Sequence, residues 1–137
     1  MASEQGKLRY ALVVLGAPYS QAATHSALRF GEALITQGHR LDTVFFYHDG
    51  VYNTSRLAAP PQDEPHLVDA WVRLANEQGT ELLVCVAAAL RRGLLDEREA
   101  QRYGKPAFSV EPPFVLAGIG QLVEAGITHD RMVTFAP

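Results

Sequence analysis

Cys85 is the only cysteine among 137 residues, and it is the side chain that points most directly to covalent chemistry. It stands in the apolar run Glu81–Ala87, typical of a buried strand, which passes directly into the helix-like segment Ala88–Arg92. The thiolate is the reactive form of cysteine, and the N-terminus of a following helix favours it by placing positive potential near the charge. The pattern therefore predicts a nucleophilic thiol. An inert, buried cysteine packed as a small hydrophobe stays open as the alternative.

Four charged or titratable residues are candidate helpers for this thiol. Arg91 and Arg92 follow Cys85 within two helical turns and would favour a thiolate. His48 and Asp49 end another apolar run, and the loops that follow parallel strands gather at one edge of a sheet. His48 would polarise a thiol or a persulfide there. A turn whose own residues satisfy one another explains His48 and Asp49 equally well.

Other reactive centres are not expected. The five histidines are scattered and none has a metal-ligand spacing, so no metal site is predicted. Gly118-Ile119-Gly120 lacks the third glycine of the dinucleotide fingerprint, and no cofactor is predicted. No serine lies in a Gly-x-Ser-x-Gly elbow, which sets the serine hydrolases aside.

Composition limits the class of protein. The chain has the length of one domain, is 47% hydrophobic and 20% charged, and has no apolar run long enough to cross a membrane. The net charge of −3 comes without a cluster of Lys and Arg, so neither direct nucleic-acid binding nor membrane binding is expected. A lone cysteine suits a reducing compartment. We expect a soluble, cytoplasmic protein.

Predicted strands and helices alternate along the chain. In order they are a strand at 8–15, a helix at 21–37, a strand at 41–47, a loop at 51–65, a helix at 64–78, the Cys85 strand, helices at 96–103 and 117–124, and a strand at 131–135. Gly79 and Gly126 are expected to end the helices at 64–78 and 117–124, and Asp96 to be the N-cap of the helix at 96–103. Trp71, Phe45 and Phe46 are expected to be packing residues. The region 105–115 holds a short strand or none. This order predicts a three-layer, flavodoxin-like α/β fold, with a mostly parallel sheet and helices on both faces. We expect one domain at 7–137 and a disordered tail at 1–6.

From about Lys7 to Phe135 the chain resembles the DsrE family of small sulfur-relay proteins. The block Cys85–Gly93 is its most specific part. The remaining blocks are Phe45–Asn53, Pro60–Glu64, Asp96-Glu97, Glu99-Ala100, Gly118–Ala125 and Asp130-Arg131.

The resemblance implies a DsrE-like fold and a sulfurtransferase whose Cys85 accepts sulfane sulfur as a persulfide. It further implies a donor of TusA type, an acceptor of TusE type and 2-thiolation of the wobble uridine in tRNA as the end product. The expected assembly is a heterohexamer with related subunits of TusB and TusC type. A persulfide relay needs one thiolate at each station and no cofactor.

Three alternatives remain open at this point. The first is the DsrE subunit of a DsrEFH complex, which carries the same cysteine block and serves dissimilatory sulfur oxidation. The second is a non-catalytic scaffold subunit of a hexamer. The third, suggested by topology alone, is a nucleotide or flavin binder.

Overall fold

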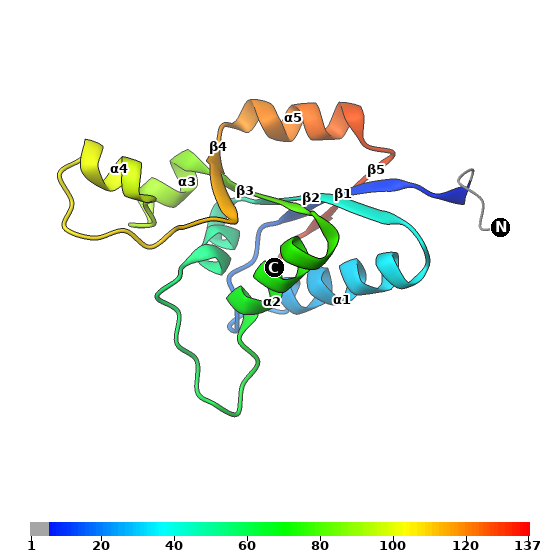
Figure 1. The fold of residues 1–137 in the computed structure, drawn as a ribbon, viewed down its shortest axis with the longest axis horizontal. Helices are drawn as coiled ribbons and strands as arrows, with labels where there is room; N and C mark the ends of the chain where they lie inside the picture. Colours follow the sequence, from blue (N-terminus) through cyan, green and yellow to red (C-terminus); the bar gives the residue numbers. More distant parts are fainter. Residues whose placement is uncertain (1–5) are drawn as a thin grey trace.

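The computed structural model describes residues 6–137, and five parallel strands form its central sheet in the order β4-β3-β2-β1-β5 (Figure 1). The tail predicted at 1–6 falls almost wholly outside the described residues. The strands are β1 (Arg9–Val14), β2 (Arg40–Phe46), β3 (Glu81–Cys85), β4 (Phe114–Ala117) and β5 (Arg131–Phe135). Every neighbouring pair runs parallel.

Helices cover both faces of the sheet. In Figure 1, α1 (Ala23–Thr36) and α2 (Leu67–Gln78) lie on one face and α5 (Ile119–Thr128) lies on the other. The short helices α3 (Val86–Arg91) and α4 (Glu97–Arg102) follow the carboxyl end of β3. The predicted three-layer α/β architecture with a parallel sheet is confirmed. No helix within residues 6–137 is long and apolar enough to span a bilayer.

Aromatic side chains fill the core between the sheet and α2. Trp71 is fully buried, and its ring meets the ring of Phe46 edge-on at a centroid distance of 5.1 Å. The Phe114 ring of β4 also packs against Phe46, with centroids 5.9 Å apart. Phe45 points to the opposite face of the sheet, is 1% exposed and meets the Tyr47 ring edge-on at 6.3 Å. All three aromatic residues, Trp71, Phe45 and Phe46, are therefore packing residues, as their spacing predicted.

Two predicted helix ends are found as the sequence indicated. Gly79 ends α2 in the left-handed conformation with φ 70°, where the missing side chain avoids a clash. Asp96 begins α4, and its Oδ1 accepts a hydrogen bond of 2.8 Å from the Glu99 N–H.

Two predictions about local structure are wrong. Residues 48–54 form the 3₁₀ helix η2 (His48–Thr54), so the predicted turn begins a helix and only 55–66 remains irregular. Helix α5 runs on to Thr128, past the stop predicted at Gly126. Glycine costs about 1 kcal/mol within a helix. Gly126 weakens α5 without ending it, because it does not take the left-handed conformation that ends a helix. A Cβ there would lie 3.5 Å from Met132 Cε, which is an ordinary contact distance.

The open question about 105–115 is answered by the edge strand β4. It begins at Phe114, near the end of that region, and pairs with β3 so that Ala117 lies beside Cys85. The ladder thus extends to the last residue of β3.

Gly50 fixes the distance between η2 and β1. A Cβ added at Gly50 would lie 1.9 Å from the carbonyl oxygen of Val14, which already accepts the Tyr47 N–H at 3.0 Å.

We therefore expect Gly50→Ala to lower the free energy of unfolding by about 3 kcal/mol, because backbone must shift to admit the methyl group. Urea unfolding followed by circular dichroism measures the change. Gly120→Ala is the matched control, since Gly120 in α5 has open space around it, and it should gain up to about 1 kcal/mol. Equal stability of the Gly50 variant and the natural chain would show that η2 is not held tightly against β1.

Candidate functional site

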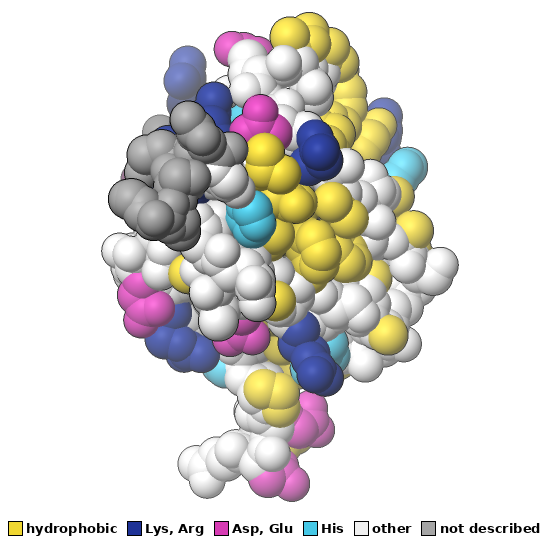
Figure 2. All heavy atoms as spheres, turned by 90° about the vertical axis from the view of Figure 1, so that its right-hand side faces the viewer, with side chains coloured by type: hydrophobic (Ala, Val, Ile, Leu, Met, Phe, Trp, Pro, Cys, Tyr) yellow, Lys and Arg dark blue, Asp and Glu magenta, His cyan; other side chains and the backbone are white. Residues whose placement is uncertain are grey.

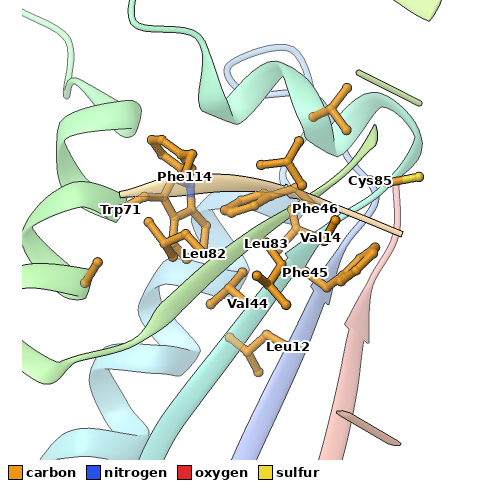
Figure 3. Close-up of a cluster of buried hydrophobic side chains, with 14 of the residues drawn as sticks. Leu12, Val14, Val44, Phe45, Phe46, Trp71, Leu82, Leu83, Cys85 and Phe114 are labelled. Atoms are coloured by element: carbon orange, nitrogen blue, oxygen red, sulfur yellow. The ribbon is translucent and has the colours of Figure 1, made fainter. Parts of the chain in front are cut away.

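Cys85 lies where β3 ends and α3 begins. It is the last residue of the strand and the N-cap of the helix, with φ −59° and ψ 115°. Only 4% of the residue is exposed. Figure 3 shows its sulfur atom pointing away from the labelled side chains of the hydrophobic cluster. The thiol is therefore at the carboxyl edge of the sheet, at the margin of the core and covered in the free chain.

The side chain of Cys85 faces the α5 side of the sheet. Successive residues of a strand point to opposite faces, so Cys85 shares a face with Leu83. Leu83 lines a hollow together with Ala125, the one buried residue of α5. Cys85 and α5 therefore belong to the same side of the molecule.

An ion pair joins α3 to η2 next to this junction. Arg92 Nε donates to Asp49 Oδ1 at 2.9 Å, and Arg92 Nη1 donates to the carbonyl of Ala88 at 3.0 Å. The Arg92 side chain is 24% exposed and that of Asp49 is 51% exposed. Ion pairs at this exposure contribute about 0.2–1 kcal/mol. The pair therefore matters more for the placement of η2 on α3 than for overall stability.

The other two predicted helpers lie on the surface. His48 is exposed, and its ring stacks on the ring of Tyr47 with centroids 4.4 Å apart. Arg91 is also exposed, at the last position of α3. The structure thus brings Asp49 and Arg92 together, whereas His48 stacks on its neighbour Tyr47. The catalytic help expected from all four residues stays a prediction.

Sequence reasoning missed Asn53, which it treated only as part of a surface loop. Asn53 is fully buried in η2, and its side-chain amide bonds to three other groups. Its Nδ2 donates to the carbonyls of Gly50 at 2.9 Å and Gly16 at 3.3 Å, while its Oδ1 accepts from Trp71 Nε1 at 3.2 Å. The sequence held one signal for this role: Asn53 is a polar residue in the block Phe45–Asn53, soon after a predicted strand.

Metal ligands do not gather at this site. Residues 6–137 hold no group of three or more His, Cys, Asp or Glu side chains that would bind a metal ion. The groups available for chemistry at this site are one thiol, the N-terminus of α3 and the Arg92–Asp49 ion pair.

Comparison with known proteins identifies the family. The model of the DsrE/DsrF-like family matches residues 8–135. The chain belongs to this family. Sulfurtransferase TusD of Serratia proteamaculans is 52% identical over 93% of this chain and 99% of its own length. Sulfurtransferase TusD of Salmonella newport is 50% identical over 93% and 100%, and the putative sulfurtransferase DsrE of Allochromatium vinosum is 48% identical over 93% and 98%.

These relatives make the chain a sulfurtransferase of the DsrE and TusD type. A solved structure supports the fold. The ychN protein from E. coli matches with a TM-score of 0.74, covering 93% of this chain and 99% of that one. At 19% identity this likeness shows the fold alone.

Burial of Cys85 leads to a prediction about access. With 4% of the residue exposed, we expect iodoacetamide to alkylate the folded chain at least about ten times more slowly than the chain unfolded in urea at the same pH. Mass spectrometry reads the rate at one site, because Cys85 is the only thiol. Equal rates in the two states would show that the sulfur is freely accessible.

Proposed function

We propose that Cys85 carries sulfane sulfur as a persulfide and relays it from a donor protein to an acceptor protein. The observation that supports this most is the position of the only thiol. It stands at the start of α3 on the carboxyl edge of the sheet, with its sulfur directed away from the core (Figure 3). Ligands and reactive groups of parallel α/β sheets collect at this edge.

The transfer is two successive displacements on sulfur. The Cys85 thiolate attacks the outer sulfur of the donor persulfide, the sulfur–sulfur bond of the donor breaks, and the donor thiolate leaves. The acceptor thiolate then attacks the outer sulfur on Cys85 and restores the Cys85 thiolate. Each step breaks one sulfur–sulfur bond and forms another, so no net oxidation occurs. A single cysteine suits this sequence, since a second thiol nearby would discharge the persulfide as a disulfide.

The burial of Cys85 adds a condition to the relay. A covered sulfur cannot meet a second protein's thiolate, so docking of a carrier must open the carboxyl edge beside α3. The free chain then keeps a loaded persulfide away from small thiols until a carrier docks. A covered persulfide is consistent with a relay protein that transfers sulfur only to the proteins that dock on it.

For the pathway we propose delivery from a TusA-type donor to a TusE-type acceptor in the cytoplasm, for 2-thiolation of wobble uridine in tRNA. The two TusD relatives, at 52% and 50% identity, support this. A second candidate, sulfur relay within a DsrEFH complex for sulfur oxidation, is supported by the 48% identity to DsrE.

For the assembly we propose a heterohexamer with related subunits of TusB and TusC type, with α5 at a contact. Ile119, Val123 and Ile127 recur every four residues along α5 and are 49%, 59% and 78% exposed. Only Ala125 of this helix is buried, and Glu124 is its one charged residue. An apolar helix face without charges is typical of a protein interface. Figure 2 shows a continuous run of hydrophobic side chains exposed on one side of the molecule.

Loading is the first test of the proposal. Incubated with a TusA-type donor protein that carries a persulfide, the chain should gain the mass of one sulfur atom, and the gain should disappear on reduction and in Cys85→Ser. Intact-mass spectrometry measures both. If the complete complex of Cys85→Ser still transferred sulfur at the normal rate, the chain would be a scaffold subunit and the proposal would fail.

The α5 contact is tested with two matched variants. Val123→Glu places a charge on the apolar ridge of α5, which is formed by Ile119, Val123 and Ile127, and Val123 is 59% exposed. Leu57→Glu places the same charge in the 55–66 loop, and Leu57 is 61% exposed. We expect Val123→Glu to weaken association with the related subunits at least about tenfold, because a charge would be buried at the contact. Light scattering of the mixed subunits measures this. An equal effect of Leu57→Glu would argue against α5.

A further inference from the structure

The fully buried amide of Asn53 connects the three elements that meet at the carboxyl edge beside Cys85. Through Gly16 it holds the loop after β1, through Gly50 it holds the first turn of η2, and through Trp71 it holds α2. The Gly16 carbonyl also accepts the Thr24 hydroxyl of α1 at 3.3 Å. One side chain thus ties together segments that are far apart in the sequence.

The hydrogen-bonding groups around Asn53 permit only one kind of side chain. The indole Nε1 of Trp71 can only donate, whereas the carbonyls of Gly16 and Gly50 can only accept. A side chain at position 53 must therefore present an acceptor on one side and two donors on the other. The asparagine amide does so in a single orientation. Aspartate has nearly the same shape but turns a carboxylate oxygen toward two carbonyl oxygens.

A chain of contacts leads from Asn53 to Cys85. Asn53 holds the Gly50 carbonyl, and Gly50 lies so close to Val14 that η2 has no room to move inward. Asp49, the residue before Gly50, is thereby placed where Arg92 binds it. Arg92 closes the C-terminal end of α3, and Cys85 is the N-cap of the same short helix.

We propose that Asn53 is a positioning residue for sulfur transfer. It fixes η2 so that Asp49 and Arg92 hold α3, and with it the sulfur of Cys85, in the geometry that transfer requires. This inference rests on the proposed relay function of Cys85, and it assigns Asn53 no contact with the sulfur. Small displacements of a reacting group cost large factors in rate, which is why a buried residue outside the site would matter.

Asn53→Asp is the main test, with Thr80→Val as the control for lost stability. Thr80 is also buried, and its hydroxyl donates to the Leu41 carbonyl at 2.7 Å near the opposite edge of the sheet. We expect transfer from a persulfide donor, measured per folded molecule in the assembled complex, to fall about tenfold in Asn53→Asp and to stay within about twofold in Thr80→Val. Equal rates per folded molecule in the two variants would overturn the proposal.

The pH dependence of the transfer rate per folded molecule distinguishes the positioning role from a mere loss of stability. At low pH the carboxyl group introduced by Asn53→Asp is protonated, and it can then donate one hydrogen bond in place of the amide's two. The rate of this variant relative to the natural chain should therefore rise as the pH falls from about 8 to about 6. The same ratio for Thr80→Val should stay flat. A flat ratio for Asn53→Asp would contradict the role assigned to the amide donors.

A double-mutant cycle tests whether Asn53 acts through Asp49. If it does, Asn53→Asp combined with Asp49→Asn should be no slower than Asn53→Asp alone, because both remove the same support of α3. Rates that fall by the product of the two single effects would refute the chain of contacts. Should Asn53→Asp fail to fold, Asp49→Asn alone weakens the half-exposed pair with Arg92 that is to hold α3. An unchanged transfer rate in that variant would refute the proposal as well.

The outcomes separate this inference from the relay function itself. If the natural chain takes up no sulfur on Cys85, the relay function fails. If it loads and transfers sulfur while the Asn53 variant does so at the normal rate, only the role of Asn53 fails.

Discussion

Two carbonyl groups inside the protein, those of Gly16 and Gly50, constrain the whole carboxyl edge of the sheet. A buried carbonyl without a hydrogen-bond partner costs about 1–3 kcal/mol. The Gly16 carbonyl also accepts the Thr24 hydroxyl, so Asn53 is its second donor. Asn53 donates to both and in turn satisfies the indole of Trp71. The loop after β1, the helix η2 and the helix α2 are therefore held together by one side chain, and the site next to Cys85 takes its shape from them.

The position of the thiol follows from two further constraints. Pairing with β4 extends to the last residue of β3, so the backbone of Cys85 is held by the ladder beside Ala117. The next residue begins α3, which the Arg92–Asp49 pair joins to η2. Exposed ion pairs add little stability, but this one links the two elements that flank the sulfur. The result is a covered thiol on the same side of the sheet as the apolar ridge of α5.

Sequence reasoning predicted the features that depend on neighbours in the chain. The alternation of apolar runs, Gly79 behind α2 and Asp96 before α4 carry local signals for strands, helices and caps, and the structure confirms them. Gly126 misled because a glycine ends a helix where it takes the left-handed conformation, and Gly126 does not take it. Asn53 was missed because its partners at Gly16 and Trp71 are distant in sequence. Cys85 was identified by its type and place, but its burial depends on packing across the sheet.

Kinetic competence of the Cys85 persulfide tests the central claim most directly. The assembled complex is loaded with radioactive sulfur, freed of the labelled donor and mixed rapidly with acceptor protein and unlabelled donor. The account predicts that label leaves Cys85 and appears on the acceptor at least as fast as the complete relay turns over. Label that stays on Cys85 while the acceptor receives unlabelled sulfur from fresh donor would contradict it.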